Sequence, residues 1–203
     1  VALEYSMGVD AMSDKQAVIQ THDLTKYYGP VRGLERLNLE VRRGEVFGFL
    51  GPNGAGKTTA IRLLLDFIRP TGGTASVFGL DSRRHSREVR RRVDYLSSDM
   101  ILYDKMTGGQ LLSYLANLRG GVDWSFVGEL VERLQCTLSQ PIRTLSRGNR
   151  QKIGLVQAFM KRPELIIMDE PTSGLDPLIQ QELYGMVEEV RADGRTVFMS
   201  SHN

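Results

Sequence analysis

The 203-residue sequence has little of several features that would assign it to a class at once. It contains a single cysteine, Cys136, so no internal disulfide bond can form, which is typical of a reducing compartment. No apolar run approaches the ~20 residues that a membrane-spanning helix needs. The first fifteen residues, which include Glu4 and Asp10, have no apolar stretch of the secretory type. The net charge of +2 argues neither for nor against a nucleic-acid partner.

Hydrophobic patterning predicts strands and a helix, then a helical middle, and then a strand, a helix and a final strand. The predicted strands cover 17–24, 37–41, 46–50, 74–78, 165–168 and 196–200, and the predicted helices cover 57–68, 109–117, 127–134, 149–160 and 178–191. The uninterrupted apolar runs at 46–50 and 165–168 are typical of strands covered on both faces. The order of elements predicts an α/β domain with a parallel core sheet and a helical insertion.

Residues 82–92 form a basic run. It contains Arg83, Arg84, Arg87, Arg90, Arg91 and Arg92. The simpler interpretation is a solvated helix face, and the alternative is a surface that contacts phosphate or a partner. No aromatic residues are interleaved, so the run does not support binding of single-stranded nucleic acid.

The segment GPNGAGKTT, residues 51–59, follows a predicted buried strand and precedes a predicted helix. It matches the pattern G-x-x-x-x-G-K-S/T in full, although an ordinary glycine-rich turn before a helix is the alternative. Glycines let successive N–H groups point inward at a phosphate, and the start of the helix adds unpaired N–H groups. We expect Lys57 to reach the β- and γ-phosphates and the Thr58 hydroxyl to ligate Mg²⁺. The predicted cradle comprises Gly51, Pro52, Asn53, Gly54, Ala55, Gly56, Lys57, Thr58 and Thr59.

An acidic pair follows the apolar run at 165–168. Asp169 ends this predicted strand, where it is expected to hold Mg²⁺ directly or through water. Glu170 comes next and is expected to project toward the γ-phosphate, where a carboxylate polarises the attacking water.

Four motifs follow one another along the chain. They are GPNGAGKTT (51–59), LSRGNRQ (145–151), LIIMDEPTSGLDP (165–177) and SSH (200–202). In this order they resemble the nucleotide-binding domain of ABC transporters, over nearly the whole chain from Val18 onward. The segments LTKYYG (24–29) and GNRQKIGLVQAF (148–159) are most similar to the ATPases of ABC-2-type exporters, such as antibiotic-resistance and bacteriocin-export systems.

The resemblance implies a P-loop NTPase of the ABC ATPase fold. This fold has a mostly parallel core sheet, an N-terminal antiparallel β subdomain and an inserted α-helical subdomain, here at approximately 87–160. The domain would cover 17–203 after a flexible lead-in at 1–16. Because the family continues with a further strand and helices beyond Asn203, the resemblance implies a C-terminally truncated domain, for which we expect weak ATP hydrolysis.

The resemblance also implies roles for single residues. Tyr28 occupies the position of the aromatic ring that stacks on adenine, with Tyr27 as the nearby alternative. Glu170 matches the general base, and His202 matches the histidine that contacts the γ-phosphate. Asp176 lies in the loop that links the two active sites of a dimer.

The segment LSRGNRQ matches the family signature, usually LSGGQ. In the family, two domains face head to tail and each signature completes the other domain's ATP site. Ser146 and Gly148 would therefore offer a hydroxyl and an N–H to the γ-phosphate of the opposite subunit. Arg147 and Asn149 replace a glycine and a glutamine, and an arginine near a phosphate is electrostatically tolerable.

A second departure concerns a metal-contacting residue. Where the family carries a glutamine or glutamate after a strand, this sequence has Ser98. Serine is too short to reach Mg²⁺ as glutamine does, so a metal role for Ser98 is in doubt. Asp99 is the alternative.

The resemblance implies an ATPase that converts ATP and water to ADP and phosphate and powers an exporter. It would use Mg²⁺, form a homodimer with a second ATP-binding domain, and dock through its helical middle on a separate integral membrane permease. It would then lie in the cytoplasm, peripheral on the inner face of the cell membrane, with no nucleic acid bound.

Two alternatives remain at this stage. A soluble non-transport ABC ATPase that acts on DNA or ribosomes would show a long coiled coil before the signature or a second such domain, and the sequence contains neither. An ATP-binding module with weak hydrolysis would typically lack the carboxylate that Glu170 provides.

Overall fold

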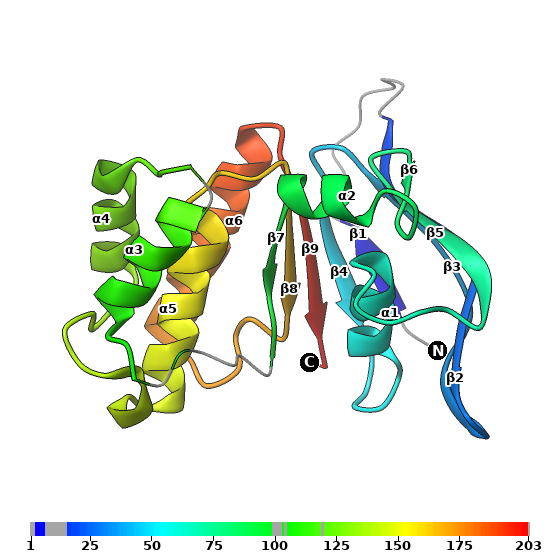
Figure 1. Cartoon of the computed structure of the whole chain (residues 1–203), viewed down its shortest axis with the longest axis horizontal. Coiled ribbons are helices and arrows are strands. Elements are labelled where there is room, and N and C mark those ends of the chain that lie inside the picture. The colour runs from blue at the N-terminus through cyan, green and yellow to red at the C-terminus, as the bar shows by residue number, and fades with distance from the viewer. Residues whose placement is uncertain (1–2, 7–15, 99–102, 104, 119, 203) are drawn as a thin grey trace.

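The computed structural model describes residues 3–6, 16–98, 103, 105–118 and 120–202. Figure 1 shows an antiparallel sheet on one side, a second sheet in the middle and a group of helices on the other side. The predicted α/β architecture, with an antiparallel β part and an inserted helical part, is confirmed.

The middle sheet positions the polar residues of interest. Its order is β1 (Leu3–Ser6), β4 (Val46–Leu50), β9 (Thr196–Ser201), β8 (Leu165–Asp169) and β7 (Val93–Leu96). The last four are parallel, so their carboxyl ends share one edge, where ligands of open α/β sheets bind. Strand β1 pairs antiparallel with β4 and lies within the segment 1–16 that was expected to be a flexible lead-in.

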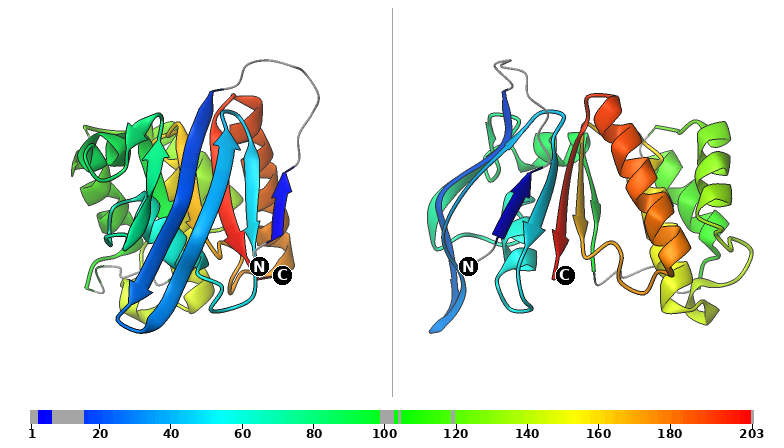
Figure 2. Two further views of the ribbon diagram at one scale, coloured as in Figure 1. Left: turned by 90° about the vertical axis from the view of Figure 1, so that its right-hand side faces the viewer. Right: turned by 180° about the vertical axis from the view of Figure 1, so that it is seen from behind.

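The antiparallel sheet is larger than the sequence predicted. It is ordered β3 (Val31–Arg42), β2 (Ala17–Tyr28), β5 (Gly72–Val77) and β6 (Leu80–Asp81). Strands β2 and β3 form a long hairpin that turns at Gly29 and Pro30, where Gly29 has a φ of 60°. Figure 2 shows this hairpin running past the end of the middle sheet.

Five of the helices match the predicted ones within four residues, a sixth lies in the basic run, and a short 3₁₀ turn was not predicted. They are α1 (Lys57–Leu64), α2 (Ser86–Arg92), α3 (Gly108–Leu118), α4 (Trp124–Arg133), the 3₁₀ turn η1 (Ile142–Thr144), α5 (Arg147–Phe159) and α6 (Pro177–Ala192). Helix α1 ends four residues before the expected end, and Asp66 takes a left-handed φ of 57°. Among the described residues, no helix combines the length and the apolarity needed to cross a bilayer.

The range 87–160 is not helical throughout. It includes strand β7, which pairs with β8 in the middle sheet. The inserted helical part therefore consists of α3, α4 and α5 within the described residues.

Two hydrophobic clusters cover the two faces of the middle sheet. Strand β8 is buried along its whole length and sends alternate residues to each cluster. Ile166 and Met168 join the cluster formed with α3 to α6, whereas Leu165 and Ile167 join the cluster formed with α1 and the antiparallel sheet. This double burial explains why residues 165–168 form an uninterrupted apolar run.

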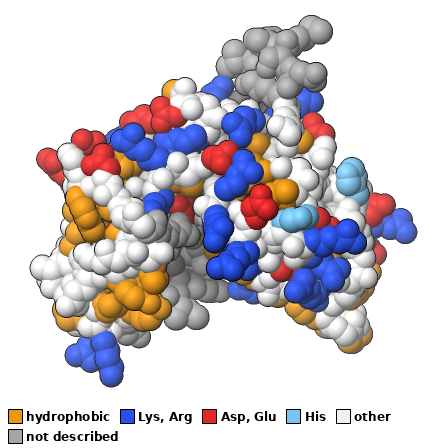
Figure 3. Space-filling model, turned by 45° about the horizontal axis from the view of Figure 1, so that its top comes forward, with side chains coloured by type: hydrophobic (Ala, Val, Ile, Leu, Met, Phe, Trp, Pro, Cys, Tyr) orange, Lys and Arg blue, Asp and Glu red, His pale blue; other side chains and the backbone are white. Residues whose placement is uncertain are grey.

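The basic run divides into two partly buried arginines and four exposed ones. Arg90 donates to the Leu65 carbonyl at 2.9 Å, and Arg92 pairs with Glu164 at 2.7 Å. Arg83, Arg84, Arg87 and Arg91 are exposed. Figure 3 brings the end of the molecule near α2 forward and shows Lys and Arg side chains gathered there. The run is thus mainly a solvated face, with two arginines that fix α2 to the domain.

Candidate active site

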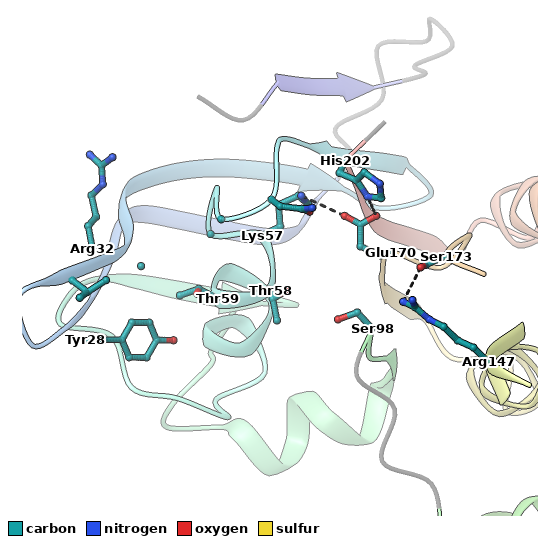
Figure 4. Close-up of a pocket in the computed structure, with 15 residues that line it drawn as sticks. Tyr28, Arg32, Lys57, Thr58, Thr59, Ser98, Arg147, Glu170, Ser173 and His202 are labelled. Atoms are coloured by element: carbon teal, nitrogen blue, oxygen red, sulfur yellow. Dashed lines mark hydrogen bonds and ion pairs between the residues drawn. The ribbon is translucent and has the colours of Figure 1, made fainter. Parts of the chain in front are cut away.

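A cavity of about 590 Å³ opens at the carboxyl edge of the middle sheet. Its lining comes from the β2–β3 hairpin, residues 51–59, the end of β7, the start of α5 and the ends of β8 and β9 (Figure 4). The predicted site residues that line it are Tyr28, Asn53, Gly54, Gly56, Lys57, Thr58, Thr59, Ser98, Arg147, Glu170 and His202. The cavity is also lined by Val31, Arg32, Gly33 and Ser173, none of which was predicted as a site residue.

Residues 51–59, here called the phosphate loop, have a conformation that requires glycine. Gly54 and Gly56 have φ values of 82° and 95°, in the left-handed region that other residues rarely adopt. A Cβ atom on Gly56 would lie 2.5 Å from the Gly33 carbonyl oxygen, so the loop and the hairpin approach each other closely. Ala55 closes the turn by donating its N–H to the Pro52 carbonyl at 3.1 Å.

The Lys57 ammonium group is buried and lies against its own loop. It donates to the carbonyl oxygens of Gly51 and Pro52, the latter at 3.2 Å, and lies 3.3 Å from Glu170 Oε1. The lysine side chain is only 6% exposed. A buried cation held in this way favours an anionic ligand, because such a ligand can replace neutral carbonyl partners.

Asp169 lies beneath the cavity in a group of hydroxyls, here called the hydroxyl cluster. Its carboxylate accepts hydrogen bonds from Thr58 at 2.7 Å, Ser98 at 3.2 Å and Ser200 at 2.5 Å. Both Asp169 and Ser200 are fully buried. The Ser200 oxygen also accepts the N–H of Glu170 at 3.1 Å, so one serine fixes both members of the acidic pair.

Ser200 was missed as a site residue. The pairing of β8 with β9 aligns it with Asp169, and this register depends on the fold. The one signal in the sequence was its place in the SSH motif, just before His202.

Glu170 projects into the cavity from a strained backbone. Its φ is 52°, which is unusual for a residue other than glycine and costs of order 1–3 kcal/mol. Its Oε2 atom lies 2.6 Å from Nδ1 of His202, and Oε1 is buried and accepts no hydrogen bond from the described residues. Figure 4 shows the carboxylate between Lys57 and His202.

The oxygen groups here fit Mg²⁺. This ion prefers hard oxygen ligands and is usually held by one or two carboxylates together with substrate phosphates. The Thr58 hydroxyl and the Asp169 carboxylate, 2.7 Å apart, offer oxygen ligands beside the phosphate loop. Among the described residues, no group of three or more His, Cys, Asp or Glu side chains could form an all-protein metal cage.

The far end of the cavity is aromatic. Tyr28 is 45% exposed there, and a Cβ atom on Gly33 would lie 2.6 Å from its ring. The neighbouring Tyr27 does not line the cavity and donates its hydroxyl to Glu35 at 2.7 Å, a bond that raises the pKa of Tyr27. Of the two tyrosines, Tyr28 is the one that lines the cavity.

Several predicted residues do not reach the cavity. Ser146 caps α5 by accepting the N–H of Asn149 at 3.2 Å, and Asp176 caps α6 by accepting the N–H of Ile179 at 3.1 Å. Gly148 packs against the Gly174 carbonyl, which a Cβ atom would approach to 2.6 Å. Asp99 lies outside the described residues.

Comparisons with known proteins agree with this geometry. A family model described as "ABC transporter" matches residues 34–173. The chain is 36% identical over 188 residues to the bacitracin transport ATP-binding protein BcrA of Bacillus licheniformis, which covers 91% of this chain and 61% of that protein. It is 33% identical over 192 residues to the probable multidrug ABC transporter ATP-binding protein YbhF of Escherichia coli, covering 92% of this chain and 33% of that one.

Solved structures have the same fold. One described as the ATP-binding subunit of an ABC transporter has a TM-score of 0.82 and 30% identity, over 91% of this chain and 79% of that chain. The cassette MJ0796, in a dimeric post-hydrolysis state bound to ADP and phosphate, has a TM-score of 0.81 over 91% of this chain and 88% of that chain. Its identity of 20% limits this likeness to the fold.

Proposed function

The chain belongs to the ABC transporter family, and from this premise we propose that it binds Mg·ATP in the cavity and hydrolyses it to ADP and phosphate. The observation that carries the proposal is the convergence of Lys57, Asp169 and Glu170 at one edge of the sheet. A cationic loop, a buried carboxylate and a carboxylate directed into the cavity are the groups that phosphoryl transfer to water needs.

Binding begins with the phosphate loop. Its N–H groups and the start of α1 attract the phosphates, and the phosphates replace the carbonyls and Glu170 as partners of the Lys57 ammonium. Adenine stacks on Tyr28 at the other end of the cavity. The Thr58 hydroxyl and the Asp169 carboxylate would hold Mg²⁺, which when bound would neutralise charge on the phosphate oxygens.

Glu170 serves as the general base in this proposal. When the nucleotide draws Lys57 away, the Glu170 carboxylate loses a cationic neighbour and becomes a better acceptor for the proton of a water molecule. His202, 2.6 Å away, holds the carboxylate in position at the phosphate end of the cavity. The strained φ of Glu170 supports this role, because strain persists where the surrounding structure imposes it.

We further propose that two copies form the working unit. Ser146 and Gly148 lie at the start of α5 and do not line this chain's own cavity, which supports a role for them in the site of a second copy. Asp176, at the start of α6, would lie in the loop between the two sites. The dimeric state of a cassette with the same fold supports this arrangement.

The proposed transport partner is an integral membrane permease on which the helical part docks. Tyr103, Tyr114 and Leu118 are exposed on or near α3, and the two tyrosine rings lie 5.7 Å apart. Exposed aromatic side chains that contact each other in this way would suit a protein-binding surface. The relatives named for bacitracin and multidrug transport support an exporter, with this chain on the inner face of the cell membrane.

Replacement of Glu170 by glutamine tests the proposed function. We expect Glu170→Gln to bind Mg·ATP, to form ATP-dependent dimers in size-exclusion chromatography, and to release phosphate at least ~100-fold more slowly, since a general base contributes typically that much. Unchanged turnover in this variant would remove Glu170 from its role. Absence of Mg·ATP binding by the unaltered protein would refute the function as a whole.

A further inference from the structure

Helix α2 and the turn before it concentrate positive charge at one end of the molecule. Residues 81–92 contain six arginines and two acidic residues, a net charge of +4, whereas the whole chain has a net charge of +2. The rest of the chain therefore carries a net charge of −2. Figure 3 shows Lys and Arg side chains gathered over this end.

The inner side of α2 is anchored to the domain. Val89 is fully buried, and the Arg90 guanidinium donates to the Leu65 carbonyl at 2.9 Å. Arg92 donates two hydrogen bonds to the Glu164 carboxylate, at 2.7 and 2.9 Å. These contacts fix the direction of the helix, so its outer side has one orientation relative to the domain.

The outer side of this segment carries exposed arginines, here called the arginine row. Its members are Arg83, Arg84, Arg87 and Arg91. The turn before α2 continues the helical pattern, because His85 donates its N–H to the Asp81 carbonyl and Val89 donates to the His85 carbonyl, each at 3.0 Å. Residues four apart are neighbours on a helix, so members of the row at this spacing follow one another along one side.

Ion pairs do not balance the charges of the arginine row. Among the described residues, none of its four side chains forms an ion pair with a carboxylate. The Asp81 carboxylate accepts the backbone N–H groups of Arg83 and Arg84, at 2.9 and 2.8 Å, and so serves the turn. Like charges that are neighbours on a helix destabilise it, and an anionic surface would relieve this repulsion.

The arginine row does not line a pocket. Its members belong neither to the active-site cavity nor to two smaller cavities beside α6, of about 290 and 220 Å³. A small ligand is typically held in a concave site by converging groups. Several cations on one exposed side are suited instead to an extended anionic surface, and no aromatic residue is interleaved to stack on single-stranded bases.

We propose that the arginine row contacts the anionic headgroups of a membrane and holds the domain against the bilayer. This proposal rests on the proposed function, because that function places the chain at the inner face of a membrane, whose lipids give it a negative surface potential. The contact is electrostatic, and each arginine near the headgroups contributes about fivefold to membrane affinity.

Co-sedimentation of the purified chain with lipid vesicles tests the contact. One vesicle contains phosphatidylglycerol and phosphatidylcholine in equal parts, and the neutral reference contains phosphatidylcholine alone. The row variant combines Arg83→Gln, Arg87→Gln and Arg91→Gln. We expect the wild type to bind the anionic vesicle only, and the row variant to bind it about 100-fold more weakly. Salt of ~1 M should abolish binding, because it shortens the Debye length to ~3 Å.

A matched control separates the position of the charges from their number. The control variant combines Arg36→Gln, Lys105→Gln and Arg143→Gln, which are exposed cations outside α2. It lowers the net charge by the same amount, but its affinity for the anionic vesicle should stay within about twofold of the wild type. A lysine variant, with Arg→Lys at the three row positions, should keep the affinity, because a charged surface attracts any cation.

Four outcomes overturn the proposal. Equal losses in the row variant and the control variant would attribute binding to net charge. Equal binding of the wild type to neutral vesicles would exclude recognition of headgroup charge. Loss of binding in the lysine variant would indicate a site that needs the planar guanidinium. Tighter binding of a short DNA duplex than of vesicles, lost in the row variant, would assign the row to nucleic acid.

Titration of Mg·ATP into the same preparations keeps this proposal apart from the proposed function. The row variant should bind Mg·ATP with wild-type affinity, which shows that it is folded, because its altered residues do not line the active-site cavity. The proposed function fails only if the unaltered protein binds no Mg·ATP, whatever the vesicles show.

Discussion

The phosphate loop and the hydroxyl cluster lie side by side, but they differ in exposure. Residues 52–54 of the loop are exposed, and the loop directs backbone groups at the cavity. Asp169 and Ser200 of the cluster are fully buried beneath it, and only Thr58 belongs to both regions. Polar groups that are buried must satisfy one another, whereas exposed ones are satisfied by water until a ligand arrives. Changes in the cluster should therefore reduce stability and chemistry together, and most changes in the loop should reduce binding alone.

Gly56 is the exception within the phosphate loop, because its replacement should reduce stability as well as binding. This replacement should cause the largest loss of unfolding free energy. Alanine at this position combines a φ of 95° with a Cβ atom 2.5 Å from the Gly33 carbonyl oxygen. We expect Gly56→Ala to lower the free energy of unfolding by about 3 kcal/mol, from backbone strain and overpacking together. Urea denaturation measures this change.

Gly54→Ala is the matched control for Gly56→Ala. Its φ is 82°, but no atom lies within 4 Å of the new Cβ, so only strain of about 1 kcal/mol is expected. Equal losses in the two variants would show that the contact with the hairpin does not constrain the loop.

The loop and the cluster also differ in how far the sequence predicts them. The loop is contiguous, so one motif predicted its strand, its glycines and Lys57. The cluster is assembled from four separated segments, and the place of Ser200 depends on the register of β9 against Asp169. The sequence aligned Ser98 with the metal-contacting residue of the family but left its metal role in doubt, and the structure shows it hydrogen-bonded to Asp169.

Short elements escaped prediction for a related reason. Strands β1 and β6 have four and two residues, too few for a pattern. Strand β7 was expected only from the family resemblance, because it follows the basic helix α2 directly and has no turn residue before it. Long apolar runs such as β4 and β8 were predicted almost residue for residue, because burial on both faces dictates their composition.

Ser200→Ala is the sharpest change within the cluster. It removes a donor to Asp169 and leaves the Glu170 N–H without its acceptor. We expect a loss of about 2 kcal/mol in unfolding free energy, because buried polar groups are left without hydrogen-bond partners. ATP turnover should fall as well, since the backbone of Glu170 loses its anchor. If Ser200→Ala were as stable as the wild type, the proposed difference between the phosphate loop and the hydroxyl cluster would be contradicted.

Ser98→Ala should have a smaller effect of the same kind. The Ser98 hydroxyl is the most distant of the three donors, at 3.2 Å, and Asp169 keeps the other two. We expect a loss of about 1 kcal/mol in unfolding free energy. Thermal and urea denaturation of Ser98→Ala and Ser200→Ala in parallel give the ranking, and a reversed order would contradict the geometry of the cluster.

The smallest loss of unfolding free energy is expected at the edge of the middle sheet opposite the cavity. Hydrogen bonding to Arg92, with Arg43 nearby, lowers the pKa of Glu164. The pair therefore stabilises the fold above the unfolded pKa of about 4.5, and this contribution is lost as pH falls through the lowered pKa. Because the carboxylate is partly exposed, Glu164→Gln should cost less than about 1 kcal/mol at pH 7.

Two readouts check this last prediction. The difference in stability between Glu164→Gln and the wild type should vanish in acid, and Mg·ATP affinity should not change at neutral pH. A difference in stability that grows as the pH falls would contradict the assigned lowering of the Glu164 pKa.

The central claim is that the phosphate loop and Lys57 hold a triphosphate, and isothermal titration of Mg·ATP into wild-type and Lys57→Ala protein tests it most directly. The account predicts saturable binding by the wild type and an affinity at least about 100-fold lower in the variant, near the upper end for a charge-assisted contact. Equal affinities in the two proteins would contradict it.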